Sequence, residues 1–421
     1  MMLLAAVIFA VTYILLLALP KFRAPVALLG GAAFLAAGIL SPAAAFAAVD
    51  WNVLLMIAGT MGLVGLFIES GMPALMANTL LRHTPNVRIA VVALAVFAGL
   101  ISAFIDNVAT VLMVAPVALA VTRRMKINPV PVLIAIAVSS NLQGAATLVG
   151  DTTSILLGGA AGMDFSDFFW YQGRPGIFWV VEAGAAVSAL ILFMLFRDCK
   201  GSVDAGEKPP VEGYFPTVLL VGMVALLAGA SLLPEKPALT NGFICMGLFL
   251  IGLIPQAAKG GLKAVRGAFA AIDLTTLALL AGVFIVVGGV QAAGLLDVIS
   301  SKFATLGGGN LCLVYTAVVW GSVLCSAFID NIPYVAAMLP VTAQVSAILG
   351  VEPTLLYFGL LIGATLGGNL TPVGASANIT AIGILRREGY EVKNRDFLRI
   401  GLPFTLAAVC TGYALLWLIW A

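Results

Sequence analysis

Long apolar segments separated by short polar ones dominate the pattern of this chain. Residues 1–19, 24–40, 214–233 and 398–420 each approach or exceed the ~20 apolar residues that cross a bilayer core as a helix. Composition agrees, because 62% of the 421 residues are hydrophobic and only 10% are charged, against roughly a quarter charged in soluble domains. The pattern predicts an all-α integral membrane protein with about ten transmembrane helices.

The two halves of the chain share a repeated motif. Ser-Ala-Phe-Ile-Asp-Asn at residues 102–107 recurs unchanged at 326–331, an offset of 224 positions, and Thr-Leu-Val-Gly at 147–150 matches Thr-Pro-Val-Gly at 371–374. The match extends upstream, where three residues of the first half align with three of the second: Asp50, Gly59 and Gly71 with Asp273, Gly282 and Gly294. Collinear matches of this kind indicate an internal duplication.

The duplication predicts an N-terminal repeat at residues 1–196, a cytoplasmic linker at 197–213 and a C-terminal repeat at 214–421. Each repeat is expected to contain five crossings and one paired segment, at about 88–122 and about 310–349. Because an odd number of crossings reverses the direction of the second half, the repeats are inverted. Inverted repeats are typical of secondary transporters.

The distribution of basic residues predicts the orientation. With the amino terminus outside, only Arg174, Lys236 and Lys302 of the 21 Lys and Arg residues fall on the external side, as the positive-inside rule requires. We therefore expect a multi-pass protein of the bacterial inner (cytoplasmic) membrane with both termini in the periplasm.

Each paired segment is either two full crossings or a re-entrant hairpin, and the charge distribution does not separate these alternatives. Apolar residues flank Asp106 and Asn107 directly, which leaves no polar stretch long enough for a surface turn. This composition favours a hairpin whose tip lies at mid-depth, where non-helical backbone must be covered by protein or line a water-filled cavity. The sequence thus predicts two re-entrant helical hairpins.

The tips carry the first candidate site residues, Asp106 with Asn107 and Asp330 with Asn331. Carboxylates inside a membrane are costly and by default indicate an ion or substrate pathway. The simpler alternative is that each Asp only caps the second arm of its hairpin. An Asn would cap a helix about as well without a charge, so capping alone does not explain the acids.

Glycine-bearing breaks in the following helices form the second candidate element. Residues 144–154 and 367–378 combine glycines with hydroxyl, amide and carboxylate side chains. They predict two broken helices, whose freed carbonyls and side-chain oxygens suit a cation or a polar substrate and whose second halves direct helix N-termini inward. Close packing of small residues is the alternative, and it would explain the glycines without the polar side chains.

The predicted substrate- or ion-binding residues are therefore Asp106, Asn107, Thr110, Thr147, Gly150, Asp151, Thr152, Ser154, Asp330, Asn331, Asn369, Thr371, Gly374, Ser376 and Asn378. No metal site is assigned, although sodium would suit Asp106, Asn107, Asp330 and Asn331. We expect one site in each half, with Asp151 beside the first tip making that site the more acidic. Glu182, six residues into a helix expected to begin at Gly176, fits either a proton relay or a contact with a neighbouring helix.

Intramembrane aspartates also occur in enzymes. Aspartyl intramembrane proteases need two converging carboxylates without Asn partners, and prenyl transfer needs clustered Asp motifs with a metal. Neither pattern is present in this sequence. We therefore predict a transporter and no enzyme activity.

The motifs resemble the ArsB/NhaD permeases of the ion transporter superfamily, over nearly the whole chain. The resemblance is carried by Ala-Phe-Ile-Asp-Asn at residues 103–107 and 327–331, by the block 367–378 and by Arg-Glu-Gly-Tyr at 387–390. The same block is similar to the P protein branch. A more distant similarity links the tips to the divalent-anion/sodium symporters, which have Ser where this chain has Asp106.

The resemblance implies an elevator-type carrier that forms a homodimer. The leading functional hypothesis is proton-coupled efflux of arsenite or antimonite, in which a titratable Asp alternates between proton and substrate. Sodium/proton antiport is the alternative, and dicarboxylate or citrate transport is a further one. No cofactor is expected, and the coupling ion is a proton or sodium. The expected partners are a small inorganic ion as substrate, membrane lipid, a second copy of the chain and a cytoplasmic ATPase subunit, with no nucleic acid.

Overall fold

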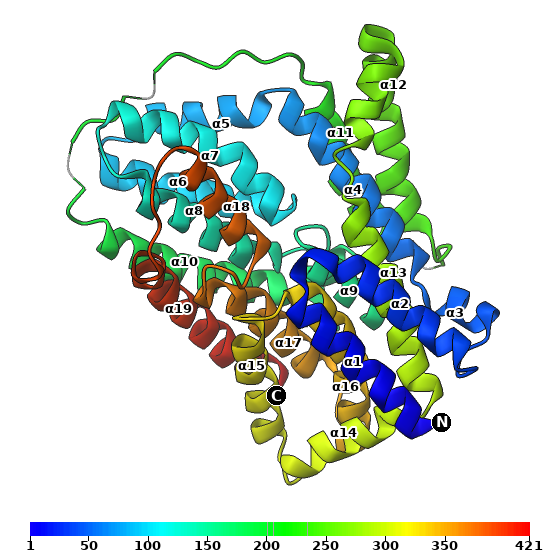
Figure 1. Cartoon of the computed structure of the whole chain (residues 1–421). Coiled ribbons are helices and arrows are strands. Elements are labelled where there is room, and N and C mark those ends of the chain that lie inside the picture. Colours follow the sequence, from blue (N-terminus) through cyan, green and yellow to red (C-terminus); the bar gives the residue numbers. More distant parts are fainter. Residues whose placement is uncertain (200, 205, 234) are drawn as a thin grey trace.

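The computed structural model describes all 421 residues except 200, 205 and 234. The side chains of residues 259 and 306 also lie outside the description. The described part is almost entirely helical (Figure 1). One short antiparallel pair of strands, β1 (Trp170–Tyr171) and β2 (Arg174–Pro175), pairs Trp170 with Pro175 and Tyr171 with Arg174.

The first half contains α1 (Met2–Ala18), η1 (Pro20–Phe22), α2 (Arg23–Ala36), α3 (Pro42–Ala48), α4 (Trp51–Glu69), α5 (Met72–Arg82), α6 (Val87–Ser102), α7 (Asn107–Arg124), α8 (Pro129–Gly144), α9 (Thr152–Ala161), η2 (Ser166–Phe168) and α10 (Ile177–Leu195). The second half contains α11 (Phe215–Ala230), α12 (Thr240–Phe269), α13 (Leu274–Ala292), α14 (Leu295–Leu306), α15 (Leu311–Ser326), α16 (Asn331–Leu349), α17 (Thr354–Gly367), η3 (Gly368–Leu370), α18 (Ser376–Arg387) and α19 (Asn394–Trp420). The order of the main helices is the same in both halves. Helix α4 therefore corresponds to α13, α8 corresponds to α17, and α9 corresponds to α18.

The all-α membrane fold with two hairpins and two broken helices is confirmed. Seven helices in the described part are long and apolar enough to cross a membrane, or up to eight if α1 and the segment 20–36, which meet at a bend of 113°, form one span. Shorter apolar pieces, among them α6, α8, α9, α11, α15 and α17, make up the rest. The number of predicted crossings therefore includes helices that are bent or broken.

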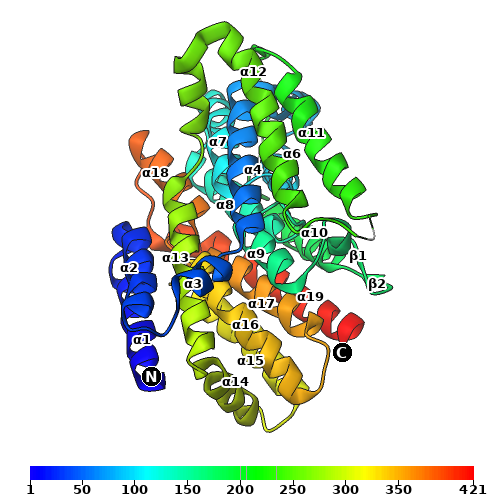
Figure 2. The same ribbon diagram turned by 90° about the vertical axis from the view of Figure 1, so that its right-hand side faces the viewer.

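The helices form two bundles (Figures 1 and 2). In the first, α4 packs on α12, α13 packs on α2, and α1 and α11 lie alongside. Glycines allow these close contacts: a Cβ on Gly59 would lie 2.4 Å from the carbonyl carbon of Cys245, and one on Gly282 would lie 2.5 Å from that of Ala27. Small residues let helix backbones approach within a membrane. We call this group the α4–α13 bundle.

The second bundle contains both hairpins and both broken helices, with α15 on α17, α10 on α19, and α6 and α7 on α8. We call it the hairpin bundle. It touches the α4–α13 bundle where α4 meets α9 and where α13 meets α16. Any substrate path between the two bundles therefore passes the hairpins and the breaks.

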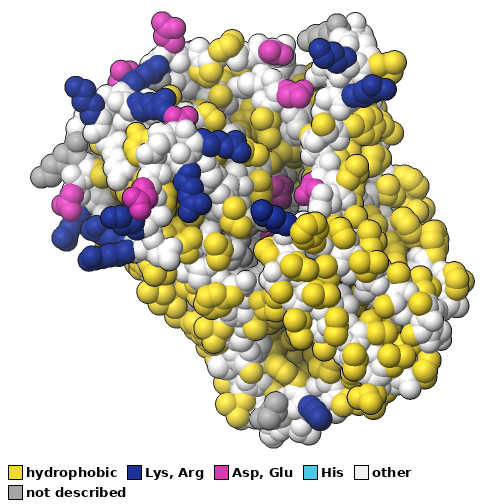
Figure 3. Space-filling model, in the orientation of Figure 1, with side chains coloured by type: hydrophobic (Ala, Val, Ile, Leu, Met, Phe, Trp, Pro, Cys, Tyr) yellow, Lys and Arg dark blue, Asp and Glu magenta, His cyan; other side chains and the backbone are white. Residues whose placement is uncertain are grey.

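The two hairpins enter from opposite ends of the molecule. Figure 1 shows α5, which leads into α6, at the upper end, and α14, which leads into α15, at the lower end. Of the tip residues, Ala103, Ile105 and Ala327 are buried, whereas Phe328 is exposed. Most Lys and Arg side chains visible in Figure 3 gather at the upper end, and the lower end shows few.

Candidate functional site

The two tip aspartates cap the second arms of their hairpins. Asp106 Oδ1 accepts hydrogen bonds from the backbone N–H of Val108 (2.9 Å) and Ala109 (3.1 Å), and Asp330 Oδ1 accepts one from Ile332 (3.1 Å). The capping alternative is therefore part of the answer. In each case capping uses only one carboxylate oxygen.

The second oxygen differs between the tips. Asp330 Oδ2 forms an ion pair with Arg23 Nη1 at 2.6 Å, in which both side chains are largely buried. Asp106 has no such partner among the described residues, and its carboxylate lines a cavity. Because Arg23 begins α2, the ion pair joins the α4–α13 bundle to the second hairpin. Nothing in the sequence brings residues 23 and 330 together, so only the structure shows this link.

One glycine in each break, Gly150 in the first and Gly374 in the second, packs directly on a hairpin tip. A Cβ on Gly150 would lie 2.7 Å from the Gly144 carbonyl oxygen and 2.8 Å from that of Ala103. The second half repeats this arrangement: a Cβ on Gly374 would lie 2.6 Å from the Gly368 carbonyl oxygen and 2.8 Å from that of Ala327. Only glycine fits so close to backbone.

Hydroxyl groups tie the breaks to the same tips. Thr147 Oγ1 donates to the Ala103 carbonyl oxygen, and Thr371 Oγ1 donates to that of Ala327. Ser154 donates to the Gly144 carbonyl at 3.0 Å, so it satisfies a carbonyl freed by the first break. The polar residues of the breaks thus hold the tips in place.

A buried amide network joins the two halves. Asn141 of α8 accepts from Asn107 Nδ2 (2.9 Å) and donates to the side-chain oxygens of Asn369 (2.7 Å) and Asn378 (3.0 Å). Asn378 Nδ2 in turn donates to the carbonyls of Gly368 (3.0 Å) and Thr371 (3.2 Å). Asn141 was not among the predicted site residues. Its signal is a run of three polar residues, 139–141, inside an otherwise apolar helix.

One cavity of about 480 Å³ collects the functional side chains, and we call it the central cavity. It lies between the bundles and is lined by six of the predicted residues: Asp106, Asn107, Asp151, Thr152, Asn331 and Ser376. Three further polar side chains line it: Asp273, which caps α13, Thr276 of α13 and Thr380 of α18. Both halves therefore contribute to a single cavity.

Asp151 links the halves within this cavity. Its Oδ2 accepts from Asn331 Nδ2 of the second tip (3.3 Å) and from Thr153 Oγ1 (2.9 Å), and its Oδ1 caps α9 through Thr152 N–H (2.8 Å). The sequence placed Asp151 beside the first tip. In the structure Asp151 shares the cavity with Asp106 of the first tip and accepts one hydrogen bond from Asn331 of the second tip.

The remaining predicted residues lie behind the cavity wall and do not line it: Thr110, Thr147, Gly150, Ser154, Asp330, Asn369, Thr371, Gly374 and Asn378. Most of them hold the tips and breaks together, as described above. The Thr110 hydroxyl is buried with no hydrogen-bond partner among the described residues. These residues thus support the side chains that line the cavity.

Asp273 lines the central cavity, and its only signal in the sequence is its repeat match to Asp50. Its carboxylate caps α13, accepting from the N–H groups of Thr275 (2.9 Å) and Thr276 (3.2 Å) and from Thr276 Oγ1 (2.6 Å). Asp50 caps α4 in the same way through Val53 N–H (3.0 Å). The repeat match was the signal that could have identified it as functional.

The lining of the central cavity is acidic. Three carboxylates line it, and none of the described lining residues is Lys or Arg. One helix end offsets this charge: α18 begins at the cavity with no side-chain cap on its N-terminus, so its first N–H groups can bind oxygen atoms. No group of three or more His, Cys, Asp or Glu side chains that could hold a metal ion occurs in the described part of the chain.

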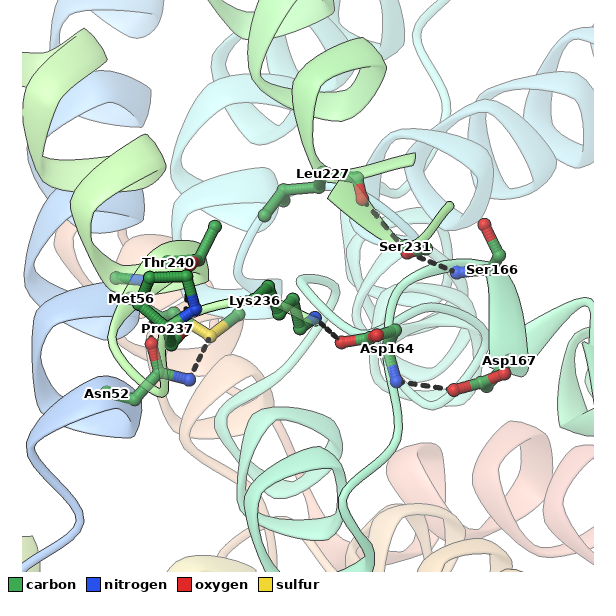
Figure 4. Close-up of polar contacts among 11 residues, drawn as sticks. Asn52, Met56, Asp164, Ser166, Asp167, Leu227, Ser231, Lys236, Pro237 and Thr240 are labelled. Carbon is green, nitrogen blue, oxygen red and sulfur yellow. Dashed lines mark hydrogen bonds and ion pairs between the residues drawn. The ribbon is translucent and has the colours of Figure 1, made fainter. Parts of the chain in front are cut away.

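A second opening, of about 370 Å³, lies where α9 faces α4 and the start of α12, and we call it the α9 crevice. Figure 4 shows Lys236 reaching across it to form an ion pair with Asp164. Ser166 N–H donates to Ser231 Oγ beside it (3.3 Å). These contacts hold the loop after α9 to the loop before α12 and so connect the two bundles. Burial raises the pKa of the Asp167 carboxyl. The hydrogen bond that this carboxyl accepts from Asp164 N–H (2.7 Å) lowers the pKa but does not cancel the effect of burial.

Known proteins resemble this chain over almost its full length. An uncharacterised transporter of Mycobacterium tuberculosis is 32% identical over 432 residues, covering 98% of this chain and 97% of the relative. The human P protein is 26% identical over 453 residues, covering 86% of this chain and 53% of the relative. The structure of the YdaH transporter of Alcanivorax borkumensis superimposes with a TM-score of 0.62 at 15% identity, covering 89% of this chain and 86% of that one.

The comparison with protein families agrees with the fold and the site. The family described as citrate transporter, CitMHS, matches residues 13–363 and 243–421. The family description, the Mycobacterium tuberculosis relative and the Alcanivorax borkumensis structure are those of transporters, which indicates a transporter and not an enzyme. The inverted arrangement of hairpins and broken helices around one cavity is that of a secondary transporter, and this chain belongs to the CitMHS family.

Proposed function

We propose that this protein is a proton-coupled secondary transporter that exports a small polyhydroxy inorganic species, with arsenite or antimonite as the specific candidate. The observation that carries the proposal is the lining of the central cavity by Asp106, Asp151 and Asp273 without a basic residue among the described lining residues. Carboxylates of this kind bind protons or cations, or accept hydrogen bonds from hydroxyl groups.

Asp106 is the best proton carrier of the three. One of its oxygens caps α7 while its carboxylate faces the cavity, so the acid can change its protonation state without losing the cap. Desolvation near the middle of a membrane disfavours the charged form of a carboxylate. Exchange of a proton for the cargo at Asp106 would give antiport.

A neutral trihydroxy compound matches the mixed polarity of the cavity. Its hydroxyl groups would donate to the carboxylates of Asp106 and Asp151 and accept from the open N-terminus of α18. Such a compound brings no charge that the acidic lining would repel. Sodium would use the same carboxylates as ligands, and a sodium/proton antiporter therefore remains the first alternative.

Citrate is a second candidate, favoured by the family description and by the uncapped N-terminus of α18, which suits a carboxylate. Fully ionised citrate carries several negative charges, and the described lining offers no Lys or Arg to balance them. Citrate would therefore enter with bound cations or after protonation of the lining acids. This requirement distinguishes it from arsenite in an assay.

Movement of the hairpin bundle along the α4–α13 bundle, as in an elevator, is the transport mechanism that we propose. Two ion pairs connect the bundles, Arg23 with Asp330 at the second hairpin tip and Lys236 with Asp164 at the α9 crevice. Both would have to break and reform during such a movement. We further propose the orientation expected from the basic residues, with both termini in the periplasm.

The test is a flux assay in proteoliposomes under an imposed pH gradient. Arsenite, sodium and citrate, the last with and without Mg²⁺, are offered separately to the wild-type protein and to empty liposomes. The proposal expects arsenite to move against the proton gradient and to discharge it. Discharge by sodium alone would establish the antiporter, and flux of citrate that requires Mg²⁺ would establish the citrate carrier. Either result would overturn arsenite as the cargo.

A further inference from the structure

A separate cavity of about 180 Å³ lies within the hairpin bundle, lined by α6, α8, α10 and Phe404 of α19. Its walls are apolar except for Ser139, Gln143 and Glu182. Asn141 and Gln143 are two positions apart on α8, a rotation of about 200°, and so they point in nearly opposite directions. Asn141 joins the amide network beside the central cavity, whereas Gln143 faces Glu182.

The side chains of Gln143 and Glu182 are only partly satisfied. Gln143 Nε2 donates to Glu182 Oε2 at 3.2 Å. Gln143 Oε1 and Glu182 Oε1 are both buried and have no hydrogen-bond partner in the described part of the chain. Gln143 itself is only 3% exposed. When Glu182 is ionised, both of these oxygens are acceptors, so neither can satisfy the other.

We propose that Glu182 and Gln143 form a proton-binding site, distinct from the carboxylates of the central cavity. A proton on Glu182 Oε1 makes this atom a donor, and Gln143 Oε1 is the acceptor that lacks a partner. The acid and the amide then form two hydrogen bonds in opposite directions, and both orphaned oxygens are satisfied by one proton. The site takes up a proton because the amide offers one donor and one acceptor to the carboxyl group.

The surroundings hold no counter-charge for an ionised Glu182. Helix α8 contains no charged residue. The only charge on α6 is Arg88, whose Nε donates to the Phe193 carbonyl at 2.7 Å near the far end of α10. The charged residues of α19 lie at its start, at positions 395, 396 and 399, before the residue that lines the cavity. A buried carboxylate without such a partner favours its neutral form.

The pair lies beside the first break and the first hairpin. Gln143 immediately precedes Gly144, the last residue of α8, and its carbonyl accepts from Ala146 N–H at 2.9 Å. A Cβ on Gly99 of α6 would lie 2.9 Å from Gln143 Cγ, so the hairpin packs closely on this side chain. Release of the proton would leave Gln143 with an unsatisfied oxygen at the point where the helix breaks. Protonation of Glu182 therefore stabilises the described arrangement of break and hairpin, whatever the cargo.

The test measures protonation directly and does not depend on transport. The full chain in lipid vesicles is treated with dicyclohexylcarbodiimide, an apolar reagent that modifies protonated carboxyl groups, and the peptides are analysed by mass spectrometry over a range of pH. We expect Glu182 to be modified at neutral pH several-fold more than Glu391, an exposed glutamate that serves as an internal control. Labelling of Glu182 only in acid, as for Glu391, would overturn the proposal, and so would protection by sodium at constant pH, which would indicate a cation site.

Infrared difference spectra test the pairing with Gln143. The spectrum of the wild type minus that of Glu182→Gln should contain the C=O band of a protonated carboxylic acid at neutral pH. Gln143→Leu removes the hydrogen-bond acceptor and should shift this band to higher frequency while the protein stays folded, as judged by size-exclusion chromatography. A band that does not move would show that Gln143 is not the partner, and absence of the band in the wild type would refute the site.

Discussion

The contact between Gly150 and the first hairpin tip gives the sharpest test of how the site is built. In Gly150→Ala the new Cβ would lie 2.7 Å from Gly144 O, 2.8 Å from Ala103 O and 3.0 Å from Ser102 O. All three neighbours are backbone atoms, so no side chain can rotate away. Relief of the Ala103 contact to an ordinary distance of roughly 3.4 Å requires the tip and the break to separate by about 0.6 Å.

The expected cost follows from this crowding. Overpacking of a close-packed interior typically costs about 1–3 kcal/mol, and about 1.4 kcal/mol corresponds to a tenfold change in an equilibrium or a rate. Separation would also strain the hydrogen bond from Thr147 to the Ala103 carbonyl. We therefore expect Gly150→Ala to lower the transport rate on the order of tenfold or more and to lower the thermal unfolding midpoint.

Gly222→Ala is the matched control. Gly222 lies in α11 with nothing within 4 Å of its added Cβ, and Ala favours a helix over Gly by about 1 kcal/mol. This variant should keep wild-type flux and unfold at the same temperature or a slightly higher one. Both variants are reconstituted at equal amounts of monodisperse protein, and pH-gradient-driven flux of the cargo found for the wild type is measured. Wild-type flux and stability in Gly150→Ala would refute the tip-to-break contact.

The remaining predictions concern charged groups. Asp106→Asn should keep the α7 cap, because Asn caps a helix about as well as Asp, but should abolish pH-gradient-driven flux in folded protein. Asp330→Asn should lower this flux less, since Arg23 already holds that carboxylate in an ion pair. Intact flux in both variants would make these acids structural. Arg23→Gln should lower the free energy of unfolding by about 1–3 kcal/mol. Adding Asp330→Asn should recover most of this loss in a double-mutant cycle. A double variant whose loss equals the sum of the two single losses would show that the pair contributes nothing. Lys236→Gln should speed the reaction of a maleimide with Asn241→Cys in the α9 crevice in a background without other cysteines, and the reversed pair, Lys236→Asp with Asp164→Lys, should slow it again.

The sequence alone determined the class of protein and the elements of the site. Apolar segments of membrane-crossing length required helices, because backbone N–H and C=O groups have no other partners in lipid. The repeated motif at 102–107 and 326–331 located both hairpin tips, and the glycines at 150 and 374 located both breaks. Local chemistry decides these features, since an Asp before a helix and a glycine on crowded backbone act within a few residues of themselves.

Only the tertiary structure decided which of these residues meet. It placed Asp151 against Asn331 of the other half, joined Arg23 to Asp330, and lined one cavity with residues of both halves. Such contacts depend on how two bundles pack, and in a membrane that packing rests on close backbone approach and hydrogen bonds between distant segments. The sequence pattern predicts which segments are helices but not which helices are neighbours, and so the contacts of Asn141 and Asp273 emerged only when the helices around them were assembled.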